Sequence, residues 1–242
     1  RLAGKVALAP LTRGGHVPFR RLCADFGCEV SFSEMAFARE LLRGAPKERA
    51  ILRRAGNEGC FGVQIATNRI DEGLRAAKMA AEAGADFVDL NCGCPIHEVT
   101  RRGMGARLLK SPPKLARLVQ GIVEGLEGQL PLTVKVRTGL GSDKVNVLRV
   151  AREMEAAGAA ALTVHGRTMA ARYSKPADWG LIDEAAGAVS IPVIGNGDLL
   201  TPYDIERRLG GTRCSAVMVG RGALVAPWVF REWRGGAPGG PP

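Results

Sequence analysis

The hydrophobic residues of the chain fall into eight runs of strand length, which are separated by longer amphipathic segments. Apolar runs of this kind are typical of parallel strands buried on both faces, whereas a half-exposed antiparallel strand would alternate. The pattern therefore predicts eight buried parallel strands. They occupy residues 6–9, 30–32, 61–65, 87–90, 132–136, 161–164, 192–194 and 216–219.

The segments between these runs contain helices whose ends can be recognised. Ser111, followed by prolines, is typical of a capped helix start, and the apolar face of that helix ends at Gly128. Thr201, also followed by proline, predicts the capped start of a second helix, which ends at Gly210.

A repeated unit connects strands and helices. Ala-rich helices over residues 72–83 and 145–157 are each followed by a glycine and an apolar run, and a polar residue, Asn91 or His165, then leaves the run. Strands and helices that alternate in this way over 242 residues predict an α/β fold, the (β/α)8 TIM barrel; a doubly wound open sheet is the alternative. We expect residues 1–234 to form the barrel and the Gly- and Pro-rich residues 235–242 to form a tail.

The composition is that of a globular protein, with 46% hydrophobic and 24% charged residues, and it excludes disordered, collagen-like and coiled-coil classes. No segment approaches the roughly 20 apolar residues of a membrane helix, and the N-terminus lacks the pattern of a secretory signal. Six cysteines without a CxxC pair fit a reducing compartment and predict no metal site. We expect a soluble protein of the cytoplasm, and also of the nucleus, without membrane contact.

The chain has a large positive charge, because 34 Lys and Arg face 24 Asp and Glu for a net charge of +10. Such a surplus favours a polyanionic partner such as a nucleic acid. An arginine-rich composition also arises from genomic base composition alone, so the charge by itself leaves both explanations open.

In a (β/α)8 barrel the active site lies at the carboxyl ends of the strands, and these positions are polar in this sequence. Glycines after the seventh and eighth runs allow the backbone to approach an anion and predict a phosphate site; the alternative is that they only form turns. The candidates at the strand ends are Pro10, Leu11, Thr12, Gln64, Asn91, Lys135, His165, Asn196, Gly197, Asp198, Gly220 and Arg221.

Lys135 stands at the end of an otherwise apolar run, where an ammonium group requires an anionic partner or a function. We expect it to contact a phosphate or an electron-rich ring, to form a Schiff base, or to pair with Asp89 or Glu34. These alternatives predict different contacts in the folded protein.

The other candidates are hydrogen-bonding groups. His165 is expected either to donate a hydrogen bond to a cofactor or to be a satisfied core histidine. The amides of Gln64 and Asn91 suit the edge of a heterocycle, and their alternative role is to tie down a loop.

The segment Cys92-Gly93-Cys94-Pro95 is the most distinctive local feature. Its cysteines are inert in the usual case, and metal ligation finds no support in the spacing of other Cys or His residues. Cys94, between a glycine and a proline in a loop that leaves a strand, would face the pocket. A thiol with the ordinary pKa of about 8.5 is protonated at neutral pH and can act as a general acid, whereas a lowered pKa would make it a nucleophile.

Taken in order, these segments resemble the catalytic barrel domain of the tRNA-dihydrouridine synthases over almost the entire chain. Residues 172–179 and 221–230 are most similar to the eukaryotic branch that modifies the variable-loop uridine U47. The motifs that carry the resemblance are Ala-Pro-Leu-Thr at 9–12, Gly-Val-Gln at 62–64, Asp-Leu-Asn-Cys-Gly-Cys-Pro at 89–95, Val-Lys-Val-Arg-Thr-Gly at 134–139, His-Gly-Arg-Thr at 165–168, Gly-Asn-Gly-Asp at 195–198 and Gly-Arg-Gly-Ala-Leu at 220–224.

The resemblance implies a flavoprotein that reduces the C5–C6 double bond of a tRNA uridine, with FMN as cofactor and NADPH as reductant. It implies that hydride passes from flavin N5 to C6 of the uracil while Cys94 protonates C5. Asn91 would lie near both the flavin ring and the uracil. The family pattern assigns the flavin ring to Pro10, Leu11, Thr12 and Gln64, its polar edge and ribityl chain to Lys135 and His165, and its phosphate to Asn196, Gly197, Asp198, Gly220 and Arg221. The tRNA phosphates would contact Arg137, Arg167, Arg172 and Lys175.

The sequence also departs from the family pattern. We expect neither the C-terminal helical tRNA-binding domain nor the N-terminal zinc-finger modules in this chain, and Met169 stands where relatives commonly have an arginine. Three other functions therefore stay open: a flavin-dependent oxidoreductase of free pyrimidines, an aldolase that uses a Schiff base on Lys135, and a non-catalytic RNA-binding barrel that needs a partner. The sequence does not predict the oligomeric state.

Overall fold

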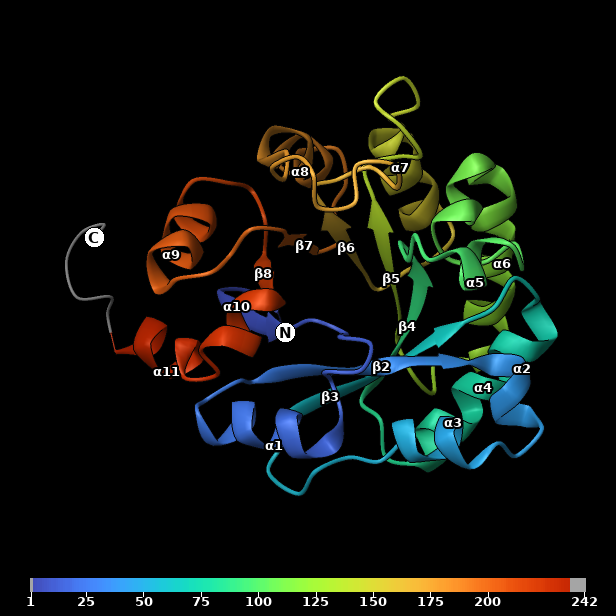
Figure 1. Ribbon diagram of the computed structural model, residues 1–242. Helices are drawn as coiled ribbons and strands as arrows, with labels where there is room; N and C mark the ends of the chain where they lie inside the picture. The colour runs from blue at the N-terminus through green and yellow to red at the C-terminus, as the bar shows by residue number, and fades with distance from the viewer. Residues whose placement is uncertain (1, 236–242) are drawn as a thin grey trace.

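Eight parallel strands close into a barrel in the computed structural model, which describes residues 2–235 (Figure 1). Each strand pairs with the next along the chain, and β8 pairs with β1 to complete the ring. The predicted barrel is therefore confirmed, and the open doubly wound sheet is wrong. The strands are β1 Lys5–Leu8, β2 Val30–Phe37, β3 Cys60–Ala66, β4 Phe87–Cys92, β5 Leu132–Arg137, β6 Ala161–His165, β7 Val193–Asn196 and β8 Ala216–Val219.

Helices follow the strands and lie outside the ring (Figure 1). None of the described helices is long and apolar enough to cross a membrane. The predicted tail lies outside the described residues except for Gly235, which follows the last helix. The helices are α1 Val17–Asp25, α2 Ala38–Leu42, α3 Pro46–Ile51, α4 Ile70–Glu82, α5 His97–Thr100, the 3-10 helix η1 Gly105–Lys110, α6 Pro112–Leu126, α7 Val147–Ala156, α8 Trp179–Gly187, α9 Pro202–Gly210, α10 Arg221–Val225 and α11 Val229–Arg234.

The two predicted helix caps have different outcomes. Thr201 accepts a hydrogen bond from the N–H of Asp204, whose side chain accepts one from the N–H of Thr201, so α9 begins with a complete capping box. Ser111 occupies the cap position of α6, but its side chain makes no capping hydrogen bond. The prediction that Ser111 caps α6 through its side chain is therefore wrong.

The interior of the barrel changes from apolar to polar along the strands. At the amino-terminal end, Phe32 and Phe87 meet edge to face at 4.9 Å between ring centroids. A side chain on Gly62 would lie 2.1 Å from the Phe87 ring, so glycine at this position makes room for the aromatic pair. At the carboxyl end, buried polar side chains replace the aromatic ones, which concentrates the hydrogen-bonding groups at one mouth of the barrel.

Candidate active site

The alternation of side chains along the strands positions the polar residues of the barrel mouth. On β4, Val88 and Leu90 pack in the main hydrophobic core. Asp89 and Asn91, which alternate with them, point to the other face of the strand and make polar contacts with Gln64 on β3. Parallel pairing then sets these residues side by side, because Asn91 is opposite Lys135 in the β4–β5 register. The same rule places His165 opposite Asn196 on β6 and β7.

A cavity of about 360 Å³ lies at this mouth, and every residue predicted for catalysis or cofactor binding lines it. The structure thus brings together groups from the ends of seven strands, whereas β2 contributes no lining residue. These lining residues are Pro10, Leu11, Thr12, Gln64, Asn91, Cys94, Lys135, His165, Asn196, Gly197, Asp198, Gly220 and Arg221. Their individual roles stay predictions, since proximity to the cavity does not identify what each group binds.

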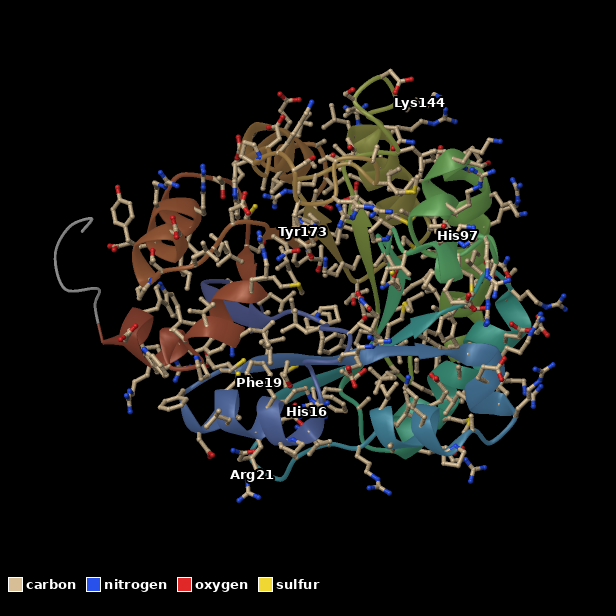
Figure 2. The ribbon with its side chains drawn as sticks, in the orientation of Figure 1. His16, Phe19, Arg21, His97, Lys144 and Tyr173 are labelled. Atoms are coloured by element: carbon tan, nitrogen blue, oxygen red, sulfur yellow. The ribbon has the colours of Figure 1, made fainter. Side chains whose placement is uncertain are left out.

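The cavity also has apolar lining residues that the sequence analysis did not predict. Ile96, Tyr173, Leu200 and Leu224 line it with side chains that are about half exposed. Tyr173 lies near the middle of the molecule in Figure 2, with its ring 4.5 Å from the guanidinium carbon of Arg221. Tyr173 and Leu224 belong to segments that carry the family resemblance, whereas Ile96 and Leu200 are apolar loop residues that gave no signal in the sequence.

Lys135 is half-buried and has no ion-pair partner among the residues that the structure describes. Its Nζ donates a hydrogen bond to Oδ1 of Asn196 at 3.1 Å. Glu34 instead accepts a hydrogen bond from the backbone N–H of Arg13, so its predicted ion pair with Lys135 is wrong. Asp89 makes no direct ion pair either, although its charge acts on Lys135 from nearby; burial, reinforced by Arg137, lowers the pKa of Lys135.

His165 is 8% exposed and lines the cavity with a neutral ring. Burial, together with the charges of Lys135 and Arg137, lowers the pKa of His165 to about 2. Nε2 lies 3.4 Å from Nη1 of Arg167. A neutral imidazole offers one donor and one acceptor, so His165 can form a hydrogen bond with a ligand without taking up a proton near neutral pH.

Cys94 is held by its backbone at two atoms. Its N–H donates to Oδ1 of Asn91 at 3.0 Å, and its carbonyl accepts from the N–H of Ala106 at 3.0 Å. A side chain on Gly105, where φ is +60°, would lie 2.6 Å from that carbonyl, so glycine is required there. Burial raises the pKa of the half-buried Cys94 thiol, which therefore stays protonated at neutral pH and is suited to donate a proton.

Two loops offer backbone N–H groups at the opposite side of the cavity. The amides of residues 197–199 and 220–222 donate no hydrogen bond to another residue in the described range 2–235. Gly197 has a φ of +133°, and a side chain there would lie 2.5 Å from Cβ of Ala177. Free amides beside the partly exposed guanidinium of Arg221 are the donor set that binds phosphate groups in proteins.

Asp198 joins the loops around this donor set. It accepts hydrogen bonds from Nη2 of Arg167 at 2.7 Å, Nη2 of Arg221 at 2.9 Å and the N–H of Ala177 at 2.7 Å. Partial burial acts to raise the pKa of Asp198, but the hydrogen bonds from Ala177 and Arg167 outweigh it and keep the pKa below the ordinary value. The carboxylate therefore organises Arg167 and Arg221 while the neighbouring amides stay free.

The four basic residues predicted to contact RNA divide into two pairs. Arg137 and Arg167 are 4% and 5% exposed, and their guanidinium groups bind neighbouring loops: Arg137 donates to the carbonyls of Gly93 and Thr168. Arg172 and Lys175 are exposed on the loop after β6, and Lys175 lines a separate groove of about 630 Å³. RNA contact stays a prediction for all four, and the buried pair has an evident structural role.

No group of three His, Cys, Asp or Glu side chains within residues 2–235 is arranged to hold a metal ion. The groups that line the mouth are the protonated thiol of Cys94, the half-buried ammonium of Lys135, the neutral imidazole of His165, three side-chain amides and a cluster of anion-binding donors.

Comparison with known proteins agrees with this arrangement. The family model described as dihydrouridine synthase matches residues 7–237. The chain is 40% identical, over 95% of its length, to a tRNA-dihydrouridine(47) synthase of Coprinopsis cinerea, and 41% identical, over 96%, to a human protein named as like that synthase. It spans about a third of each relative, 36% and 35% respectively.

Solved structures share the fold at low sequence identity. Histamine dehydrogenase from Rhizobium sp. 4-9 superposes with a TM-score of 0.75 at 15% identity, over 96% of this chain and 46% of that one. A 2-naphthoyl-CoA reductase superposes with a TM-score of 0.70 at 15% identity, over 97% of this chain and 50% of that one. At these identities the likeness is one of fold.

Proposed function

Because this chain belongs to the dihydrouridine synthase family, we propose that its barrel reduces the C5–C6 double bond of a uridine in tRNA, at position 47 of the variable loop. We propose FMN as the resident cofactor, NADPH as its reductant and tRNA as the partner. The observation that carries the proposal is a single cavity that joins a protonated Cys94 thiol to a cluster of free backbone amides beside Arg221.

The residues present fit FMN. The cavity volume of about 360 Å³ lies within the usual range of roughly 300–1,000 Å³ for small-molecule sites. The amides of residues 197–199 and 220–222, with Arg221, would hold the phosphate. Gln64 would meet the flavin ring, and Lys135 with His165 would hold its polar edge and ribityl chain. When bound, FMN supplies the hydride that adds to C6 of the uracil.

The protein supplies the matching proton. Cys94 donates its thiol proton to C5 as C6 gains the hydride, so the double bond is lost, dihydrouridine forms and the thiolate is reprotonated from solvent. The raised pKa of Cys94 keeps the donor protonated at neutral pH. A positioned general acid typically contributes a factor of about 10²–10⁴ to the rate.

The tRNA must present the uridine outside its base stack, because the thiol lies in the cavity rather than on the surface. Exposed cations on the loop after β6, among them Arg172 and Lys175, would bind the flanking phosphates. Binding through phosphates releases counterions, so affinity for tRNA should fall steeply as salt is raised.

The proposal is tested by the flavin spectrum of the purified chain and by nucleoside analysis of tRNA after incubation with NADPH. Cys94→Ala should keep the flavin and lose dihydrouridine formation by about 10²-fold or more. Cys60→Ala is the matched control, since Cys60 is also half-buried but begins β3 at the far end of the barrel.

Two of the alternative functions have outcomes of their own in such experiments. A colourless chain that takes up no FMN, or unchanged turnover by Cys94→Ala, would overturn the proposal. Reduction of free uracil without turnover of tRNA would favour the small-molecule oxidoreductase, and borohydride trapping of a carbonyl substrate on Lys135 would favour the aldolase.

A further inference from the structure

A continuous chain of hydrogen bonds runs beneath the cavity from a buried carboxylate to the backbone of Cys94. Asp89, which is fully buried, accepts from Nε2 of Gln64 at 2.7 Å and from Oγ1 of Thr133 at 2.7 Å. Oε1 of Gln64 accepts from Nδ2 of Asn91 at 2.8 Å. Oδ1 of Asn91 then accepts from the N–H of Cys94 at 3.0 Å.

The direction of this chain follows from the charge at its start. An ionised carboxylate has no proton to donate, so only the NH₂ end of Gln64 can face Asp89. Its oxygen must then face Asn91, which in turn must use its NH₂ group there and its oxygen toward Cys94. If Asn91 were reversed, its NH₂ group would confront the N–H of Cys94, and two donors would meet without an acceptor.

The burial of Asp89 argues that this carboxylate is not kept for stability. It has no ion-pair partner within the described part of the chain, and desolvation raises its pKa. A buried, unpaired carboxylate is costly to the fold, and an apolar residue that fills the same space is often neutral or stabilising at such a position.

We propose that Asp89 is a positioning residue that fixes the orientation of both amides, so that Asn91 presents only an N–H donor to the ligand and Cys94 is held in its reactive place. The oxygen of Asn91 already accepts from the backbones of Gly93 and Cys94, and its NH₂ group has one proton left after the bond to Gln64. The polar capacity that remains on Asn91 is therefore that of a donor.

The carboxamide of Asn196 at the mouth also has its oxygen occupied and an N–H left for a ligand. Oδ1 of Asn196 accepts from Lys135 and its Nδ2 donates to the carbonyl of Met218 at 2.8 Å, which leaves one N–H on that nitrogen. The N–H groups that remain on Asn91 and Asn196 therefore suit a ligand face that is rich in hydrogen-bond acceptors. The carbonyl and ring-nitrogen edges of flavins and pyrimidines are faces of this kind. This identification of the ligand rests on the proposed function; the direction of the hydrogen-bond chain does not.

The experiment compares three variants of the full ¹⁵N-labelled chain by ¹H–¹⁵N NMR. Asp89→Asn keeps the shape of the side chain but places an NH₂ donor at the start of the series of hydrogen bonds. Either orientation of the Gln64 carboxamide then becomes possible. We expect the Asn91 carboxamide signals to split or broaden and the Cys94 amide proton to move upfield. Thr133→Val removes the other hydrogen bond to Asp89 but keeps the charge, so both sets of signals should stay in place.

Gln64→Met provides the test if Asp89→Asn does not fold. It interrupts the chain between the carboxylate and Asn91 with an apolar side chain of similar length, and the Cys94 amide should shift as in Asp89→Asn. A Cys94 amide that is unchanged in a folded Asp89→Asn or Gln64→Met chain would overturn the proposal.

An activity measurement separates this proposal from the proposed function. If the chain reduces tRNA, Asp89→Asn should lower kcat by about 10²-fold with little change in KM for tRNA, because a misplaced acid impairs chemistry rather than docking. If the chain has no such activity, the NMR result still decides the role of Asp89.

Discussion

Replacing Asp198 by asparagine should destabilise the protein strongly, because it removes the charge that three groups share. The new carboxamide would keep one acceptor oxygen, but its NH₂ group would confront a donor from Arg167 or from the N–H of Ala177. Asp198 has a φ of +51°, and asparagine tolerates this conformation as well as aspartate does, so the substitution tests the charge without adding backbone strain.

The magnitude follows from the burial of the two partners. The side chain of Arg167 is 4% exposed and that of Asp198 is 31% exposed. Removing one partner of a buried ion pair costs about 3–5 kcal/mol, and the partial exposure of Asp198 places the expected loss near the lower end, about 3 kcal/mol. For a domain of this size that corresponds to a decrease in Tm of roughly 6–12 °C.

Asp183→Asn is the matched control. Asp183 has the same side-chain exposure, 31%, and also binds an arginine through two nitrogens, but the side chain of that arginine, Arg213, is 58% exposed. Thermal unfolding of both variants at pH 7 should show a much smaller decrease for Asp183→Asn, because solvent screens its pair. Equal decreases would refute the argument that the burial of Arg167 makes the Asp198 contact strong.

The pH dependence of the difference in stability between the wild type and Asp198→Asn gives a second check. Because the folded state lowers the pKa of Asp198, its contribution is present above the ordinary value of about 3.9 and is lost as the pH falls through the lower folded value. The gap in stability between the wild type and Asp198→Asn should therefore persist to about pH 4 and close only below it.

Three further predictions concern the backbone, the imidazole and the thiols. Gly197→Ala should lower the free energy of unfolding by at least about 2 kcal/mol, through a strained φ and a clash, whereas Gly210→Ala, with open space around it, should be neutral or stabilising in thermal unfolding. The ring protons of His165 should show no titration between pH 5 and 8 by NMR, since its pKa is about 2; a midpoint in that range would contradict the described burial. Burial raises the pKa of Cys28 and Cys92, so stability should fall above about pH 9 as the unfolded thiols ionise, by up to about 1.4 kcal/mol per pH unit for each; stability that is constant to pH 10.5 would be the contrary result.

The strands could be predicted from the sequence because a parallel barrel buries both faces of each strand, which leaves an apolar run as its record. β2 shows the limit of that signal. Its apolar run ends at Phe32, yet the strand continues to Phe37, since β3 pairs with Met35 and the residues after it beyond an irregularity in the register. The predicted strand covers residues 30–32 only, whereas Glu34 and Met35 lie within the observed strand, because pairing partners rather than hydrophobicity extend it there.

The lining of the cavity could be predicted for a related reason, as the fold itself gathers the strand ends. The contacts of the arginines could not. A sequence shows that Arg137 is cationic but not that the carbonyls of Gly93 and Thr168, from two other loops, will surround its guanidinium. For Asp198 likewise, the sequence located the loop correctly but did not indicate that the carboxylate binds Arg167 and Arg221.

These internal contacts leave the cavity with a definite excess of charge. Lys135, Arg137, Arg167 and Arg221 line it with four positive charges, whereas Asp198 in the wall and Asp89 beneath the floor provide two negative ones, and His165 is neutral. The surplus of two positive charges is equal in magnitude and opposite in sign to the charge of a phosphate monoester dianion, so a ligand with such a group, as in the proposed FMN, would neutralise the cavity. Because the uncompensated charge opposes folding when the cavity holds no anion, such a ligand should stabilise the loops around Asp198 and Arg221 beyond what its direct contacts provide.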